Sequence, residues 1–292
     1  MTKEYLNYLK YEKRYSQHTL VSYKNDLDQL EHFLSSEYPD TELKDINHAI
    51  IRDWVISLSS QNLNSNSINR KLVTIRSFFK FLLKKGVVNK NPATKLTNLK
   101  TKKGLPHFIR ENDISLLFDN LLDEKNFIDF RDHLVVELLY GTGMRLSELV
   151  ELKESRIDQV NTTIKVLGKR KKERLIPVNR GLIELIKKYI SLKNEAFEGN
   201  ATDYLIVSNR GRKSYPMMIN RIVKKFLQGA SVDKKSPHIL RHTYATHLLE
   251  RGADLNAVKD LLGHQSLAAT QIYTHNSLGK LKKVFDQAHP KA

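Results

Sequence analysis

The sequence predicts a mainly α-helical protein of two domains, the second of which contains a small antiparallel sheet. The chain has 292 residues, a length that at usual domain sizes corresponds to two domains, each with its own core. Apolar residues recur every three or four positions through most of the chain, as on one face of an α-helix. Two short segments rich in β-branched residues, TTIKVLG and ERLIPV, flank a basic GKRKK and predict a single hairpin.

Three amphipathic helices are expected before Gly86. The first begins after Ser16 and the second after Asn47, because each of these side chains can accept a hydrogen bond from the first helical turn. The third ends at Gly86 and the following Asn91–Pro92 pair. Their apolar stripes are Leu20, Tyr23, Leu27, Leu30 and Leu34; Ile51, Trp54, Val55 and Leu58; and Ile68, Leu72, Ile75, Phe79 and Leu82.

The third helix also carries basic residues that lie mostly outside its apolar stripe. They are Arg70, Lys71, Arg76, Lys80, Lys84 and Lys85. Each one alone is more simply a solvated side chain, but as a set on a small helical domain they favour phosphate binding. The whole chain has a formal net charge of +17, so a polyanion such as nucleic acid is the expected partner. A basic but otherwise ordinary protein is the alternative.

Composition excludes several other classes of protein. The chain has no cysteine, which rules out disulfides, thiolate nucleophiles and cysteine-bound zinc and fits a cytoplasmic setting. The first residues, MTKEYLNYLKYEKRYS, contain no apolar run of the kind found in a secretory signal. No window reaches the roughly 18 uncharged apolar residues of a membrane span, so no membrane partner is expected.

The domain boundaries follow from a change in composition after Ala93. Residues 1–93 form the first domain, and the polar, lysine-rich residues 94–106 are expected to be a linker. Residues 107–292 form the second domain, with a helix from about Asp113 and another through RDHLVVELLYG that breaks at glycines before RLSELVEL. YLIVS, near residue 204, is a candidate for a further strand, and helices are expected again from Met217 onward.

The densest group of chemically active side chains lies in PHILRHTYATHLL, where Pro237 suits the first turn of a helix. His238 and Arg241 are three residues apart and project from one side, so one imidazole and one guanidinium can bind the same anion. His238 and His242 could instead bind a metal, but the arginine between them would repel a cation. A structural role for these side chains is an equal alternative.

A second candidate, Arg145 in GTGMRLSELV, follows a glycine-flanked break at the expected start of a helix. Free N–H groups and the helix dipole favour an anion at such a position. Glu148, three residues on, can hold the guanidinium in place. The alternative is a surface arginine–glutamate pair that contributes little to stability.

Six side chains taken together would form a metal-free phosphoryl-transfer site. They are Arg145, Lys169, His238, Arg241, His264 and Tyr273. Each guanidinium can bind two phosphate oxygens, and fixed cations can stabilise the charge that develops on the phosphate. Lys169, near the hairpin tip, can protonate a leaving group, and the phenol of Tyr273 becomes a nucleophile when its proton is removed or shared. By itself, Tyr273 would be more simply a packing aromatic.

Four segments in this order closely resemble the tyrosine recombinases, in particular the Xer-type site-specific recombinases. The segments are GTGMRLSEL, VLGKRKKERLIPV, PHILRHTYATHLLERGADL and LLGHQSLAATQIYTH. The resemblance extends over essentially the whole chain. It implies an N-terminal SAM-like helical domain that binds core DNA and a C-terminal α+β tyrosine recombinase catalytic domain with a small antiparallel sheet. Both domains would close as a C-shaped clamp around duplex DNA.

The resemblance also implies a role for each candidate residue. Arg145 and Arg241 would neutralise the scissile phosphate, Lys169 would protonate the leaving oxygen, and Lys171 or Lys172 are close alternatives for that lysine. His238 would assist proton transfer and His264 would hydrogen-bond the phosphate. Tyr273 would attack and form a 3′-phosphotyrosyl bond, while His275 fits the motif without a chemical role. No cofactor, metal or ATP is required, since the covalent intermediate keeps the bond energy.

The implied partners are a double-stranded DNA recombination site and three further protomers. The tetramer would contain this chain alone or this chain with a paralogous recombinase, and a septal DNA translocase is a candidate activator. The tail after Tyr273 would dock on a neighbouring protomer or on its own domain. The expected function is resolution of chromosome dimers through a Holliday junction, favoured by the lack of an extra N-terminal arm-binding domain. The alternatives are a mobile-element integrase, a type IB topoisomerase and a nonenzymatic DNA-binding protein.

Overall fold

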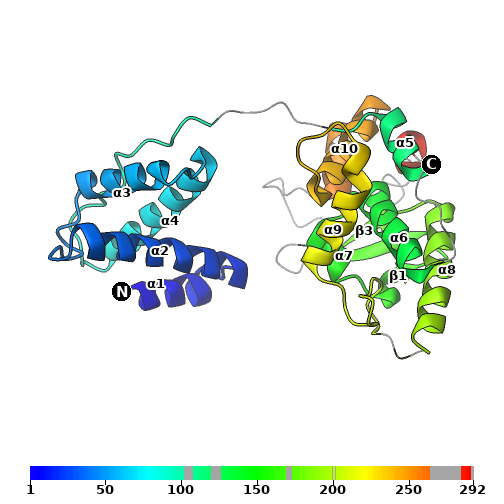
Figure 1. The fold of residues 1–292 in the computed structure, drawn as a ribbon, viewed down its shortest axis with the longest axis horizontal. Coiled ribbons are helices and arrows are strands. Elements are labelled where there is room, and N and C mark those ends of the chain that lie inside the picture. The colour runs from blue at the N-terminus through cyan, green and yellow to red at the C-terminus, as the bar shows by residue number, and fades with distance from the viewer. Residues whose placement is uncertain are drawn as a thin grey trace. The chain divides into compact units, whose positions relative to one another are not determined.

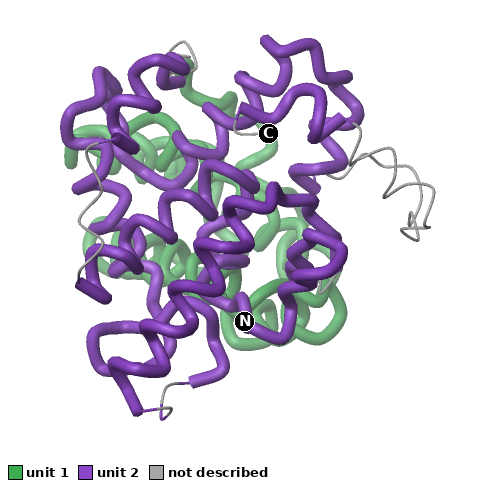
Figure 2. Tube along the Cα trace, turned by 90° about the vertical axis from the view of Figure 1, so that its right-hand side faces the viewer, with its two compact units in different colours: residues 1–104 green, residues 105–292 purple. Residues whose placement is uncertain are grey.

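The computed structural model describes residues 1–101, 108–119, 126–168, 173–198, 200, 202–263 and 284–290. The chain divides into two compact units, Met1–Gly104 and Leu105–Ala292 (Figure 2). Each unit has its own apolar core. Helices dominate the described part of both, and a small antiparallel sheet lies in the second, so the predicted fold class is confirmed.

The N-terminal unit is a bundle of helices (Figure 1). Trp54, which is 1% exposed, belongs to its core. Its elements are α1 (Thr2–Asn7), the π-helical turn η1 (Tyr8–Glu12), α2 (Gln17–Glu37), α3 (His48–Ser60) and α4 (Ser65–Lys84). The three expected helices are therefore present. The Ser16 hydroxyl accepts a hydrogen bond from the Thr19 backbone N–H, and the Asn47 side chain accepts from the first turn of α3, as predicted.

The first helical segment was not expected from the sequence. Tyr5 and Leu9 are four residues apart and both are buried in the core, so α1 and η1 contribute one face to the bundle. The Lys13 N–H donates to the Tyr8 carbonyl five residues earlier, which gives this stretch its π-helical form.

Two of the basic residues of α4 bind a buried carboxylate, and one of them is itself buried. Lys71 is 5% exposed, and its Nζ lies 3.0 Å from Oδ1 of the fully buried Asp26. Arg70 binds both oxygens of the same carboxylate at 2.6 and 2.7 Å but keeps 47% of its side chain exposed. The expectation that the basic residues face solvent is therefore wrong for Lys71. Its ammonium compensates the charge of the buried Asp26 carboxylate.

Part of the expected linker 94–106 packs on α4. Asn69 exchanges two hydrogen bonds with the backbone of Leu99, at 2.8 and 2.9 Å. Arg76 donates to the carbonyls of Ala93 and Leu96. The packed structure of the first unit thus continues past residue 93.

The C-terminal unit is built around helix α6 (Figure 1). Its elements are α5 (Glu111–Asp119), α6 (Phe127–Thr142), α7 (Leu146–Val150), η2 (Glu154–Arg156), β1 (Ile157–Asp158), β2 (Thr163–Leu167), β3 (Glu173–Pro177), α8 (Arg180–Ala196), α9 (Pro216–Phe226), η4 (Leu227–Gly229), α10 (Pro237–Glu250) and α11 (Leu255–Leu262). Helices α8, α9 and α10 pack against α6. Almost every residue of α6 after Phe130 is buried, which explains why its apolar pattern extends around the helix.

The sheet is antiparallel with the order β1–β2–β3. Thr163 pairs with Pro177 and Leu167 with Glu173, so the predicted hairpin is confirmed. The further strand expected near YLIVS does not form. Tyr204 and Val207 make only isolated bridges, to Lys153 and Lys213.

The break after α6 is set by Gly143, which ends the helix in the left-handed region with φ of +59°. A Cβ at this position would lie 2.5 Å from the ring of Tyr244 in α10 and 2.8 Å from Leu262 in α11. Only glycine therefore allows the chain to turn here against two buried side chains. The turn places Arg145 at the N-terminal end of α7.

Two buried histidines form hydrogen bonds near the two ends of the described part of the C-terminal unit. His247 Nε2 donates to the Ile109 carbonyl at 2.8 Å, so its Nδ1 accepts from the Tyr140 hydroxyl at 2.9 Å. Near the C-terminus, His289 Nε2 donates to the Gly141 carbonyl, and residues 284–290 pack on their own unit. This is one of the two docking modes expected for the tail. No helix within the described ranges is long and apolar enough to cross a membrane.

Candidate functional site

Three of the six predicted site residues lie in the described part of the chain. Arg145 precedes α7, and His238 and Arg241 belong to α10. Lys169, His264 and Tyr273 lie outside the described residues. The geometry below therefore concerns the arginines and the groups that hold them.

Arg145 is held by a buried carboxylate. Its Nη1 lies 2.8 Å from Oε1 of Glu148, and its backbone N–H donates to Oε2 of the same residue at 2.7 Å. The Glu148 side chain is only 1% exposed, whereas that of Arg145 is 32% exposed. The pair is therefore not the weak surface contact considered as an alternative, because the carboxylate is inside and orients a guanidinium that reaches solvent.

Arg241 projects from α10 into the same region and is 9% exposed. Its Nη1 donates to the carbonyl of Gly143, in the turn before Arg145, and its Nη2 donates to the Leu262 carbonyl at 2.6 Å. Arg145 Nη2 donates to the next carbonyl, that of Gly263, at 3.0 Å. The structure thus brings both predicted arginines to the C-terminal end of α11, where the helix dipole favours cations.

His238 lies one turn before Arg241 on α10, and its side chain is exposed. His242, the other member of the metal pair considered above, is also exposed. Within the described ranges, no group of three or more His, Asp and Glu side chains is placed to hold a metal ion.

A third arginine, Arg174 of β3, belongs to this cluster and was not singled out from the sequence. It is 5% exposed and binds both Glu148 oxygens, with Nη1–Oε1 at 2.6 Å and Nη2–Oε2 at 2.9 Å. The sequence contains a pattern that could have identified Arg174 as buried. Side chains alternate along a strand, and Arg174 shares the face of the fully buried Ile176. A charged residue on the core-facing side of a strand requires a buried partner.

The cluster carries more positive than negative charge. Arg145, Arg174 and Arg241 face one carboxylate, which leaves an excess of two positive charges in a largely buried place. Burial, and then repulsion from the other two guanidiniums, lower the pKa of Arg241 to about 10. Burial alone would raise the pKa of Glu148, but its bonds to Arg174 and Arg145 bring it below the usual value. An anion would relieve the repulsion between the arginines.

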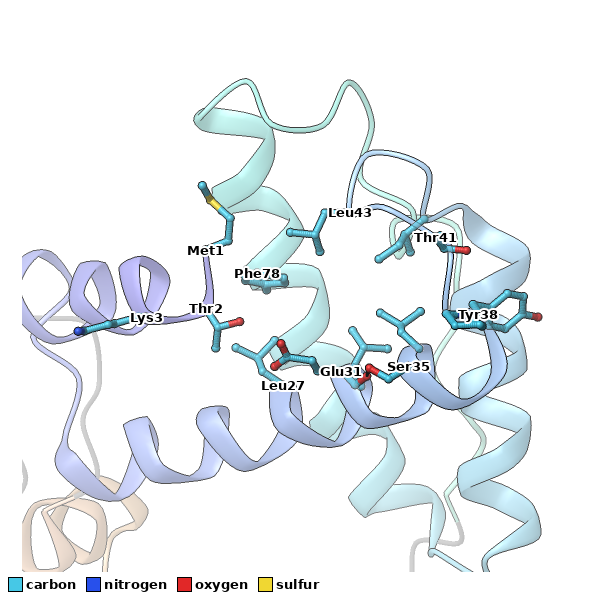
Figure 3. Close-up of a pocket in the computed structure, with 14 residues that line it drawn as sticks. Met1, Thr2, Lys3, Leu27, Glu31, Ser35, Tyr38, Thr41, Leu43 and Phe78 are labelled. Atoms are coloured by element: carbon cyan, nitrogen blue, oxygen red, sulfur yellow. Dashed lines mark hydrogen bonds between the residues drawn. The ribbon is translucent and has the colours of Figure 1, made fainter.

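A separate groove of about 430 Å³ lies in the N-terminal unit (Figure 3). Its lining includes the apolar side chains of Leu27, Leu43 and Phe78 and the carboxylate of Glu31. Lys3 extends away from the other lining residues. The groove therefore has no concentration of cations, in contrast to the arginine cluster.

Family models match both units of the chain. Residues 2–86 match the N-terminal SAM-like domain of phage integrases, and residues 107–279 match the phage integrase family. The chain belongs to the phage integrase family. The second match includes the arginine cluster and the segments that contain Lys169, His264 and Tyr273.

Curated relatives within the phage integrase family cover almost the whole chain. Tyrosine recombinase XerC of Staphylococcus saprophyticus is 39% identical over 99% of this chain and 96% of its own length. Tyrosine recombinase XerC of Thermodesulfovibrio yellowstonii is 38% identical over 98% of this chain and 95% of its own length. The predicted enzyme class is thus confirmed: the chain is a site-specific recombinase that breaks and rejoins DNA.

Solved structures show the same fold at lower identity. The XerH site-specific recombinase bound to its palindromic difH substrate superposes with a TM-score of 0.73 at 19% identity, covering 97% of this chain and 83% of that one. The Tn1549 transposon integrase in complex with circular intermediate DNA gives a TM-score of 0.72 at 19% identity, covering 96% and 97%. Both likenesses support the two-domain architecture described above.

Proposed function

We propose that the arginine cluster binds the scissile phosphate of a DNA recombination site. The observation that carries this proposal is the excess of two positive charges among the described residues around Glu148. Burial, and then repulsion from Arg145 and Arg174, lower the pKa of Arg241. Arg145 and Arg241 would contact the nonbridging oxygens, because each guanidinium has five N–H donors and uses only some of them on protein groups. Fixed cations in a largely buried site stabilise the charge that develops on phosphorus.

The remaining steps are assigned to residues that match the family motifs. The Tyr273 oxygen attacks phosphorus and forms a 3′-phosphotyrosyl bond, while the bond from phosphorus to the 5′-oxygen breaks. Lys169 gives a proton to that oxygen, and His238 takes the proton from Tyr273. His264 hydrogen-bonds the phosphate. The 5′-hydroxyl of the partner strand then attacks phosphorus and releases Tyr273, which yields a Holliday junction after one exchange.

The N-terminal unit would bind the DNA backbone through the basic side chains of α4 that face solvent. Arg70 keeps 47% of its side chain exposed while Asp26 fixes its orientation. Lys80, Lys84 and Lys85 are also exposed. Such contacts position the duplex without reading its sequence.

The substrate we propose is a chromosomal recombination site at which dimeric chromosomes are resolved at cell division. The near full-length match to relatives named XerC supports this over integration of a mobile element, although the Tn1549 integrase shares the fold. The reaction would take place in the cytoplasm, in a tetramer of this chain alone or with a paralogous recombinase. A septal DNA translocase is a candidate activator.

The experiment that tests this proposal has two steps. Footprinting on the terminus region of the host chromosome identifies the binding sequence, and a nicked suicide duplex of that sequence then traps the covalent intermediate. We expect a protein–DNA adduct and strand exchange with the wild-type chain. Relaxation of supercoils without exchange would indicate a type IB topoisomerase, and binding without an adduct would indicate a nonenzymatic protein.

The nucleophile is tested by Tyr273→Phe, which removes only the hydroxyl. The adduct should disappear while affinity for the duplex stays within about threefold, since the phenol contributes to chemistry and not to backbone contacts. Gel electrophoresis under denaturing conditions measures the adduct. An undiminished adduct would refute the assignment of Tyr273.

A further inference from the structure

Arg174 is the most extensively bonded of the three arginines in the cluster. Both of its Nη atoms bind Glu148, and its Nε donates to the Leu261 carbonyl at 3.1 Å. All three nitrogens of the guanidinium are therefore used on protein acceptors. Its side chain is 5% exposed, so Arg174 is placed to organise the site and not to contact DNA.

Glu148 transmits the position of Arg174 to Arg145. Its Oε1 accepts from Nη1 of both arginines, at 2.6 Å from Arg174 and 2.8 Å from Arg145. Its Oε2 accepts from Arg174 Nη2 and from the Arg145 backbone N–H. A bidentate fork fixes the plane of the carboxylate, which in turn fixes both the side chain and the backbone of Arg145.

The same guanidinium also contacts the C-terminal end of helix α11. Three successive carbonyls at this end each accept from a different arginine: Leu261 from Arg174, Leu262 from Arg241 and Gly263 from Arg145. Gly263 has φ of +64°, and a Cβ there would lie 3.1 Å from Arg174 Cδ. Arg174 thus packs directly against the residue that precedes His264 in the sequence.

We propose that Arg174 is a positioning residue for DNA cleavage: through Glu148 and the end of α11 it holds Arg145 in the orientation that binds the scissile phosphate. This inference rests on the proposed role of Arg145 at that phosphate. It makes Arg174 necessary for the rate of cleavage although it never touches DNA. In this proposal a residue of hairpin strand β3 determines the orientation of Arg145, at the start of α7.

A lysine at position 174 keeps the positive charge but cannot form the paired hydrogen bonds that the guanidinium makes with both Glu148 oxygens. Its single ammonium cannot bind both Glu148 oxygens in plane and also reach the Leu261 carbonyl. We expect Arg174→Lys to slow formation of the covalent adduct by about 100-fold, the cost of a small misplacement of a reacting group. Arg174→Met should be slower still, and Arg174→Lys is the variant to use if Arg174→Met does not fold.

A double-mutant cycle separates positioning from general damage to the fold. The probe is the nicked suicide duplex of the footprinted sequence, and the readout is the single-turnover rate of adduct formation at saturating protein. If Arg174 acts through Arg145, Arg174→Lys should slow the Arg145→Lys variant by less than about threefold, because the orientation it controls has already been lost. Rate losses that multiply across the cycle would overturn the proposal, as would an Arg174→Lys rate within about threefold of wild type.

Lys193 provides a matched control in the same unit. It is 1% exposed and bound to the Glu154 carboxylate and to the carbonyls of Thr202 and Tyr204. Lys193→Met therefore removes a buried cation outside the cluster. Lys193→Met should change the rate of adduct formation by less than about threefold. In the double variant with Arg145→Lys, the two rate changes should multiply, because the sites are independent.

Failure of the proposed function would look different. A wild-type chain that forms no adduct, or an Arg145→Lys variant that reacts at the wild-type rate, would remove the role of Arg145 itself. If the wild-type chain forms the adduct and Arg145→Lys is slow, the role of Arg145 stands. Rate losses of Arg174→Lys and Arg145→Lys that multiply would then reject only the positioning role of Arg174.

Discussion

Each unit of the chain contains a buried carboxylate that binds two cations, and the two clusters differ in what surrounds them. Asp26 in the N-terminal unit accepts hydrogen bonds from Arg70, Lys71 and Thr74. Glu148 in the C-terminal unit accepts from Arg145 and Arg174. Both carboxylates are almost inaccessible, with 0% and 3% of the residue exposed.

The difference is a third cation. In the C-terminal cluster Arg241 adds a charge, and its hydrogen bonds in the described part of the chain go to the carbonyls of Gly143 and Leu262. In the N-terminal cluster, the third donor to the carboxylate is the uncharged hydroxyl of Thr74. The N-terminal cluster connects α2 and α4, whereas we propose that the C-terminal cluster is completed by a bound phosphate. The described N-terminal cluster has an excess of one positive charge, from Arg70 and Lys71 against Asp26, and the C-terminal cluster has an excess of two.

The largest effect on folding is expected from Asp26→Ala. This change leaves the buried ammonium of Lys71 without its carboxylate, which should cost about 3–5 kcal/mol of the free energy of unfolding. Urea unfolding followed by the fluorescence of Trp54, the single tryptophan of the chain, reports on this unit.

Asp28→Ala on the same helix is the matched control for Asp26→Ala. Asp28 forms a solvent-exposed pair with Lys24 one turn away, so its loss should change the unfolding free energy by less than about 0.5 kcal/mol. If the two variants had equal stability, Asp26 would not be a structural centre and the contrast between the clusters would fail.

A smaller effect, but one on both stability and cleavage, is expected from Gly143→Ala. A methyl group here meets Tyr244 and Leu262 in a left-handed turn, which should cost about 2–4 kcal/mol. Because the Gly143 carbonyl accepts from Arg241, the adduct rate should also fall. Thermal unfolding and the suicide-duplex assay measure the two effects.

Gly86→Ala separates backbone strain from crowding. Gly86 has a similar φ of +71°, but a Cβ there meets nothing within 4 Å. Its loss should cost about 1 kcal/mol without any change in adduct rate. If Gly143→Ala and Gly86→Ala lost equal amounts of unfolding free energy, contacts with α10 and α11 would not determine the shape of the turn at Gly143.

Local signals predicted most of the fold. Ser16 and Asn47 cap helices as expected, and the pattern of TTIKVLG and ERLIPV gave the correct hairpin, because these features depend on residues near in sequence. The strand expected near YLIVS does not form, because a strand also needs pairing partners that lie elsewhere in the sequence. Leu205, Ile206 and Val207 are buried, yet Tyr204 and Val207 find only single bridging partners.

The parts of the site that could not be predicted depend on partners distant in sequence. The motifs identified Arg145 and Arg241, but a motif does not show that Arg174 turns inward to a carboxylate 26 residues away. Likewise, Lys71 looked like one basic residue among several until the structure placed Asp26, 45 residues earlier, against it. Three-dimensional packing decides which charges are buried.

Arg241 and its neighbours are proposed to bind the scissile phosphate, whereas the N-terminal cluster connects helices of its own unit. The most direct test compares two buried cations, Arg241→Met and Lys71→Met, in the single-turnover suicide-duplex assay at saturating protein. Arg241→Met should slow adduct formation by at least about 100-fold, as expected for loss of one donor to the developing charge. Lys71→Met should stay within about threefold of wild type. An Arg241→Met variant that forms the adduct at the wild-type rate would contradict the account.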